Sequence, residues 1–270
     1  MTFPDPSDLV KISSSEYYFD DESSKKNREY VLHKVRFHGE ALYYADESLK
    51  KDKEIVLTAV TQWGQALEYA DESLKKDREI VLAAVKQQYG VALQYADISL
   101  KKDREIVLAA LKEGGLALGY ADESLRKDRD IVLTAVKKHG SALMYADEHF
   151  KKDREIVLAA VKNSGVALYY AAEHLKKDKE IVLAAVKQSY LVLDYVDDSL
   201  KKDKDIVLVA VKHHGTALEY ADENLKKDKE VVLTAIKNDT GAIFYMDESF
   251  FQDDDVNSLL DECLGEYVEI

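Results

Sequence analysis

Apolar and polar residues recur along the chain in an order that predicts pairs of short helices. In segment 77–86, Asp77 and two charged residues precede an apolar run from Ile80 to Val85, which a Lys follows. Asp is a favourable N-cap, an acid suits the first helical turn and a Lys suits the last one. At 100° per residue the apolar residues, Leu82 among them, cover about 200° of the helix surface. We therefore expect this first helix, helix A, to form the buried layer.

A glycine follows helix A, and a second amphipathic segment follows the glycine. Gly90 is placed to adopt the left-handed backbone conformation that ends many helices. Ala92, Leu93, Ala96 and Leu100 then follow the spacing of one helix face, which predicts a short helix B. The same glycine slot is filled by Gly39, Gly64, Gly115, Gly140, Gly165 and Gly215.

This unit recurs along almost the whole chain. The string Tyr-Ala-Asp-Glu-Ser-Leu-Lys-Lys-Asp returns every 25 residues, with a single 26-residue step that places one extra residue near Gln87 and Gln88. Helices of about ten residues are unstable alone, so each pair has to pack on its neighbours. We predict an all-α fold, an α-solenoid of about ten helix-turn-helix repeats with a right-handed superhelix. The first position of the string falls at Phe19, Tyr44, Tyr69, Tyr95, Tyr120, Tyr145, Tyr170, Tyr195, Tyr220 and Tyr245.

Both ends of the chain depart from the repeat. Residues 1–18, with Pro4 and Pro6, predict an N-terminal arm, and residues 19–255 form the tandem repeats. Residues 256–270 predict a C-terminal capping helix, because a terminal repeat has no neighbour to cover its outer face. The apolar stripe of that helix consists of Val256, Leu259, Leu260, Cys263 and Leu264.

Charge and composition narrow the function classes. The net charge is −14, of which residues 1–24 contribute −5 and residues 245–270 contribute −9, so the repeats between them are neutral. Long-range attraction to nucleic acid or to an anionic membrane is therefore not expected. The longest apolar runs, such as Ile106 to Leu111, are far shorter than the ~20 residues that span a bilayer. With one cysteine and no signal-peptide pattern, we expect a soluble, cytoplasmic protein.

The repeat motif resembles that of a known family. Asp-Lys/Arg-Glu-Ile-Val-Leu-x-Ala-Val-Lys, followed by Gly-x-Ala-Leu-x-Tyr-Ala, is similar to the tandem repeats of a domain of unknown function found in protists, algae, giant viruses and bacteria. The resemblance covers residues 19 to about 255 and implies a helical repeat fold without any catalytic residue to assign. Tyr190 and Thr240 in the glycine slot and Ala172 in the Asp slot depart from the motif. A more distant likeness to leucine-rich variant repeats implies, as an alternative, a helix B that is partly 3₁₀.

Residues that carry out catalysis or bind metals are sparse. No phosphate-binding loop, dinucleotide fingerprint, nucleophile elbow or Cys-x-x-Cys pair occurs, and the acids all lie in the same solvated setting. His149 and His174 fill one slot in successive repeats, where roughly 8–10 Å separates the backbones and no further zinc ligand is evident. The acidic run 253–255 lacks the Gly and Glu of a calcium loop. We expect no enzymatic activity, no metal and no cofactor.

Two regular columns each allow a binding and a structural interpretation. We call the tyrosines at the first position of the repeated string the Tyr column. They predict either a ladder that stacks bases or sugars, or rings that pack between repeats with their hydroxyls in water, and we favour packing. The Lys pairs, such as Lys50 and Lys51, predict either a ridge for a polyanion or ion pairs that link the repeats. We favour the ion pairs.

The repeats differ most in two other columns, the slot before the glycine and the slot before the Tyr. Aromatic residues on a regular scaffold suit contact with a protein or peptide, although neutral drift at solvent-exposed positions gives the same variation. We predict a non-enzymatic scaffold that binds a protein or peptide along the turn between helices A and B, with Trp63 and Tyr89 as anchors. The alternative is a structural spacer or self-assembling rod without a specific ligand. The candidate binding residues are His38, Tyr43, Trp63, Tyr89, His139, Met144, Tyr169, His214 and Phe244.

Overall fold

The computed structural model describes residues 21–265, so the N-terminal arm and Phe19 lie outside the described residues. Within that range every regular element is a helix. The chain forms two compact units, which meet between Lys138 and His139, and each is described by itself. The predicted all-α repeat fold is confirmed, and the handedness of the superhelix stays a prediction.

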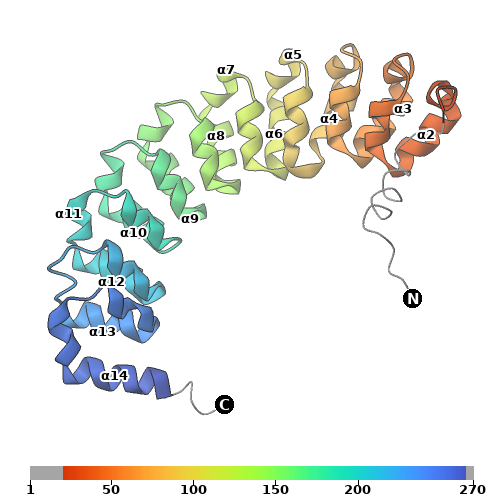
Figure 1. Ribbon diagram of the computed structural model, residues 1–270. Helices are drawn as coiled ribbons and strands as arrows, with labels where there is room; N and C mark the ends of the chain where they lie inside the picture. The colour runs from red at the N-terminus through yellow and green to blue at the C-terminus, as the bar shows by residue number, and fades with distance from the viewer. Residues whose placement is uncertain (1–20, 266–270) are drawn as a thin grey trace, which may run out of the picture. The chain divides into compact units, whose positions relative to one another are not determined.

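The first layer of each unit is a row of α-helices that lie side by side (Figure 1). Within a unit, each of these helices packs on the next one in the row, as α2 does on α3 and α12 does on α13. In the first unit the row consists of α2 (Arg28–Phe37), α3 (Lys53–Gln62), α4 (Arg78–Val85), α6 (Arg104–Glu113) and α8 (Arg129–Lys138). In the second unit it consists of α9 (Arg154–Asn163), α10 (Lys179–Val186), α12 (Lys204–His213), α13 (Lys229–Asn238) and α14 (Asp254–Gly265).

The α-helices begin where the sequence places helix A. Asp77 accepts hydrogen bonds from the backbone amides of Glu79 at 2.9 Å and Ile80 at 3.3 Å, so it caps α4 as predicted. Ile80 and Val81 are fully buried. Leu82, however, is only half-buried, so the buried arc is narrower than we expected. The interior of each repeat is therefore an Ile-Val-Ala-Val stripe.

The second layer consists of 3₁₀-helices that follow the glycine slot. These are the elements predicted as the first part of helix B, and the 3₁₀ alternative is the correct one. In the first unit they are η2 (Gly39–Tyr44), η4 (Gly64–Tyr69), η6 (Gln88–Tyr95) and η7 (Gly115–Tyr120). In the second unit they are η8 (Gly140–Tyr145), η10 (Gly165–Tyr170), η12 (Tyr190–Asp194), η13 (Gly215–Tyr220) and η14 (Thr240–Phe244).

Helix B is not one continuous helix from Ala92 to Leu100. The 3₁₀-helix ends at Tyr95, Ala96 is extended at φ −66° and ψ 152°, and a separate turn of helix follows. The cause is Asp97, whose backbone amide donates to the carbonyl oxygen of Lys75 in the preceding repeat at 3.0 Å. The Asp97 carboxylate accepts from the amide of Ser99 at 2.9 Å and begins the new helix.

These separate turns form a third row of short helices beside the other two. In the first unit the row consists of η1 (Ser24–Lys26), η3 (Leu49–Lys51), η5 (Leu74–Lys76), α5 (Ile98–Lys101) and α7 (Glu123–Arg126). In the second unit it consists of η9 (Phe150–Lys152), η11 (Leu175–Lys177), α11 (Asp198–Lys201) and η15 (Glu248–Gln252). Backbone hydrogen bonds join successive turns, as from Asp71 to Lys50 at 3.0 Å and from Asp222 to Lys201 at 3.1 Å.

Most positions of the glycine slot have a different physical reason from the one we predicted. Only Gly90 has a positive φ, 73°, among the described glycines. At Gly64, a Cβ atom would overlap the carbonyl oxygen of Ala84, in the last turn of the next α-helix, and would lie 3.0 Å from Cβ of Gln87. The left-handed prediction is therefore confirmed at Gly90, whereas the other glycines of the slot, such as Gly64, are required because the next repeat approaches closely.

The extra residue lies in the turn before Gly90, as predicted. Gln88, Tyr89 and Gly90 adopt successive positive φ values of 41°, 61° and 73°. The following repeat accommodates this bulge with a second glycine, since a Cβ on Gly114 would lie 2.9 Å from that of Tyr89 and would overlap the Tyr89 carbonyl oxygen.

The last helix of the second unit, α14, packs against α13. It begins two residues before the predicted start, because Asp253 caps it by accepting from the amides of Asp255 and Val256 at 3.0 and 3.2 Å. Val256 is fully buried, and Leu259 and Leu260 are half-buried.

Candidate functional site

The starts of the α-helices form ladders of ion pairs between repeats. Lys53 contacts Asp77 and Glu79 of the next repeat, each at 2.8 Å. Arg154 contacts Asp178 at 2.8 Å in the same way, and its guanidinium holds the pKa of that carboxyl below its ordinary value. These contacts are exposed, so each contributes little stability. One cation faces two acids at each step, so this ridge has a negative balance.

The Lys pairs also meet acids, in accordance with the ion-pair interpretation. The first Lys of a pair turns back to a Glu in its own repeat, as Lys75 does to Glu72 at 2.8 Å. The second Lys reaches the Asp of the next repeat, as Lys177 does to Asp197 at 3.0 Å. A ridge whose cations face acids at this spacing has little charge left for a polyanion.

The histidines singled out above do not converge. His149 contacts Asp147 in its own repeat, Nδ1 to carboxylate oxygen, at 2.6 Å. Across the described residues, no group of three or more His, Cys, Asp or Glu side chains is arranged to hold a metal ion. No helix in the described part of the chain is both long enough and apolar enough to cross a membrane.

Exposed apolar side chains gather on the second layer. Among the described residues, twelve large apolar side chains are exposed, and nine of them lie in its 3₁₀-helices. We call the exposed side of these helices within each unit the 3₁₀ face. The nine residues are Tyr43, Tyr89, Leu116, Tyr120, Met144, Val166, Tyr169, Leu191 and Phe244.

The candidate residues from the slot before the Tyr are all exposed on this face. The most exposed of them are Phe244 at 82% and Tyr169 at 62%. The residues of the slot before the glycine lie at the other end of each 3₁₀-helix and vary more in exposure. The half-buried members of that slot are His38, Trp63 and His139, and the exposed members are Tyr89 and His214.

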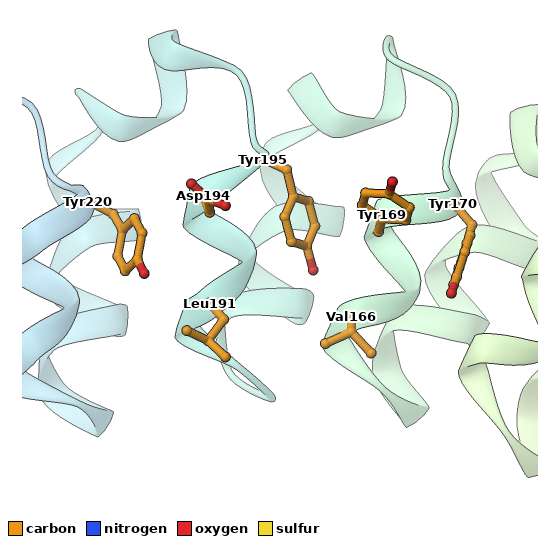
Figure 2. A pocket seen from close by; sticks show the side chains of 7 residues that line it. All are labelled: Val166, Tyr169, Tyr170, Leu191, Asp194, Tyr195 and Tyr220. Atoms are coloured by element: carbon orange, nitrogen blue, oxygen red, sulfur yellow. The ribbon is translucent and has the colours of Figure 1, made fainter.

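Aromatic contacts join the two slots across the Tyr column. The Trp63 indole stacks on the Tyr69 ring with centroids 6.2 Å apart, and Tyr43 meets the same ring edge-on at 4.9 Å. Trp63 is thus partly occupied by its neighbours and offers less free surface than Tyr89, which is 73% exposed. The rings of Tyr170, Tyr195 and Tyr220 lie between successive 3₁₀-helices, as the packing interpretation requires (Figure 2). At Tyr195 the hydroxyl is buried, so the expectation of a hydroxyl in water is wrong there.

A pocket of about 400 Å³ lies on the 3₁₀ face of the second unit, where Tyr190 replaces the glycine (Figure 2). Of the residues that line it, only Tyr169 was a candidate from the sequence. The sequence analysis did not single out the slot directly after the glycine as a binding site. In the repeated sequence this slot holds the apolar residues Leu116, Val166 and Leu191. The lining residues are Val166, Tyr169, Tyr170, Leu191, Asp194, Tyr195 and Tyr220.

Tyr195 occupies the middle of this pocket. Its ring meets the Tyr169 ring edge-on at 5.7 Å, and Figure 2 shows it between η10 and η12. The Tyr195 hydroxyl is buried and has no hydrogen-bond partner in the described part of the chain. Burial, together with the negative charge of Asp194, raises the pKa of Tyr195 to about 12. The phenol is therefore neutral over the physiological pH range.

The 3₁₀ face is acidic as well as apolar. The nine 3₁₀-helices of the second layer contain no Lys and no Arg, and their acids are Glu40, Glu68, Asp194 and Glu219. From the third row, Nζ of Lys101 donates to the Gln94 carbonyl oxygen at 2.6 Å. Nζ of Lys176 lies 5.8 Å from the Tyr169 ring centroid and is paired with Glu173 at 2.8 Å.

Comparison with known proteins identifies the repeats but no characterised relative. The family described as Domain of unknown function (DUF4116) matches residues 27–75, 52–101, 77–126, 128–176, 153–201, 178–226 and 203–251. The matches overlap in steps that follow the repeat. No curated protein matches the chain. No solved structure matches it either.

Proposed function

Starting from the fact that this chain belongs to the DUF4116 family of tandem helical repeats, we propose that it is a non-enzymatic scaffold that binds a peptide segment of another protein on its 3₁₀ face. The family carries no assigned activity. The proposal rests on the surface of this chain.

One observation carries the proposal, the concentration of exposed apolar side chains on the 3₁₀ face. Single exposed apolar residues are ordinary on any protein, but a row of them on one kind of element marks an interaction surface. Tyr, Met and Phe give large contact areas at a low cost in conformational entropy. Because the rows repeat at a fixed spacing, they suit an extended segment that offers one side chain to each repeat.

A spacer or self-assembling rod without a specific ligand is the second candidate, and the ion-pair ladders of the first layer favour it. They join repeat to repeat and need no partner. A spacer, however, gives no reason for apolar residues to gather on the 3₁₀ face rather than on the rest of the surface.

A displayed library of random linear peptides, selected on the full chain, tests the proposal. The two test substitutions are Tyr89→Ser and Phe244→Ser, one on the 3₁₀ face of each unit, made together. The matched control is Phe37→Ser with Phe251→Ser, because these rings are 68% and 59% exposed but lie off the 3₁₀ face. We expect selected peptides to bind the test variant at least tenfold more weakly, corresponding to about 1.4 kcal/mol, and the control variant unchanged.

Two results would overturn the proposal. One is a library that yields no peptide with saturable binding, and the other is equal weakening by the test and control variants. Circular dichroism has to show unchanged helical content in both variants, so that a loss of binding is not a loss of fold. The one Trp of the chain, Trp63, gives an independent fluorescence signal for binding to the first unit.

A further inference from the structure

We propose that the pocket around Tyr195 receives an arginine side chain of the bound segment, with Asp194 as its counter-charge. This inference rests on the proposed function and adds the chemistry of the partner. It is carried by the walls of the pocket, by its uncompensated charge and by a buried polar atom.

The walls suit a long side chain with a flat, cationic end. Val166 and Leu191, 41% and 48% exposed, offer apolar contact for methylene groups. Figure 2 shows the rings of Tyr169 and Tyr195 above them, on the side of Asp194. Ring faces attract cations, and a planar guanidinium stacks on them better than an ammonium does.

Asp194 supplies a negative charge that the protein itself does not neutralise. Most acids of the repeats meet a Lys or Arg, but Asp194 has no ion-pair partner among the described residues, and neither has Glu219 in the next repeat. The Asp194 carboxylate is exposed and close enough to raise the pKa values of Tyr195 and Tyr220. An acidic side chain is therefore repelled here, and a basic one is attracted.

The buried hydroxyl of Tyr195 points to a polar guest rather than a purely apolar one. A buried hydroxyl without a partner is energetically costly, and a guest with N–H donors lowers that cost by giving the hydroxyl oxygen a hydrogen bond, although it offers the O–H no acceptor. A guanidinium has five N–H donors and no acceptor, so it matches a pocket that offers a carboxylate and a neutral hydroxyl oxygen. A leucine side chain fills the walls but leaves both polar groups unsatisfied.

The test uses peptides that bind the full chain, each prepared with Arg, Lys, Gln, Leu or Glu at every position in turn. At one position we expect Arg to bind about tenfold more tightly than Gln, with Lys between them and Glu weakest. In the Asp194→Asn variant this Arg-to-Gln ratio should fall close to one. In Glu223→Gln, which removes the same charge from an exposed residue outside the pocket, the ratio should stay near ten.

A second variant separates the ring from the charge. Tyr169→Leu keeps an apolar side chain but removes the aromatic face, so we expect the Arg-to-Gln ratio to fall about threefold, whatever the change in the affinity of the Gln peptide itself. Peptides that bind without preferring Arg at any position, or an Arg preference that survives Asp194→Asn, would overturn the inference but leave the proposed function standing. If no peptide binds the chain at all, both fail.

Discussion

The first layer and the 3₁₀ face are built from the same repeats but tolerate change very differently. In the α-helices, the Ile-Val-Ala-Val stripe and the capping Asp recur with few changes, and the stripe is fully buried from α3 to α13 with one side chain 1% exposed. On the 3₁₀ face, corresponding positions hold Tyr, Glu, Gln, Gly, Met, Asp and Phe. The buried side chains that stabilise the repeats therefore recur, and they include the Ala and Leu of each 3₁₀-helix, such as Ala92 and Leu93, whereas the exposed 3₁₀ face is free to vary with the partner.

Acidification should have the largest effect on the stability of the repeats, because it removes the Asp caps of every repeat at once. The pKa of Asp77 is lowered by its hydrogen bond to Lys53, that of Asp178 by Arg154, and that of Asp197 to about 2 by Ser199 and Lys177. The folded pKa values lie below the unfolded value of about 3.9, so this stability is present above pH 4 and is lost as the pH falls towards 2. We expect helical circular dichroism to collapse in that window.

The same titration in 0.5 M NaCl serves as the control, because salt screens the repulsion between cations but does not prevent protonation of the carboxylates. A chain that keeps its full helical signal and a cooperative melt at pH 2 would contradict the role given to the Asp ladders.

Truncation inside the buried stripe should cost more than any other single substitution. Ile156 is fully buried in α9, and we expect Ile156→Ala to lower the free energy of unfolding by about 2–5 kcal/mol, as measured by urea denaturation. Leu158→Ala in the same helix removes a half-buried side chain and should cost clearly less. Equal costs would mean that the stripe is wider than the structure shows.

Filling the glycine slot should have the next largest effect on stability. A Cβ on Gly215 would overlap the Ala235 carbonyl oxygen and lie 2.9 Å from Cβ of Asp239, so Gly215→Ala should cost about 1–3 kcal/mol. Gly241 is the matched control, since its Cβ would meet only a side-chain oxygen of Asp239 at 3.1 Å and Thr216 at 3.7 Å. A thermal melt in which both alanine variants behave alike would refute the close-approach explanation.

Loss of one helix cap should have the smallest effect. Asp128 accepts from the amides of Asp130 at 2.9 Å and Ile131 at 3.0 Å, and Asp128→Ala should cost about 1 kcal/mol. Asp130→Ala, which removes an exposed acid from the same helical turn, should cost a few tenths of that. If urea denaturation ranks the two in the opposite order, Asp128 does not act as the cap.

The sequence predicted the α layer well because its signals are local. The cap at Asp77, the acid after it and the apolar run at Ile80 specify a helix without reference to the rest of the fold. The glycine slot was predicted correctly at Gly90 but not at Gly64, where the reason for glycine lies in the next repeat, because Ala84 brings a carbonyl oxygen against it. Helix B was drawn too long for the same reason, since the amide of Asp97 bonds to another repeat.

The candidate site was only partly predictable. Variation between repeats led to Tyr43, Tyr169 and Phe244, which lie on the 3₁₀ face. It did not lead to the pocket, because Tyr195 belongs to a column that is the same in nearly every repeat. What distinguishes Tyr195 is its surroundings, with Tyr169 and Val166 from the preceding repeat, Asp194 beside it and Tyr220 from the next, and those depend on three repeats at once.

Hydrogen exchange of the full chain, with and without a selected peptide, tests most directly whether the 3₁₀ face is the binding surface. The account predicts that the peptide slows exchange of the amides in the 3₁₀-helices of the second layer, while the amides at the starts of the α-helices exchange as before. Protection confined to the ion-pair ladders of the α layer, with the 3₁₀-helices unchanged, would contradict it.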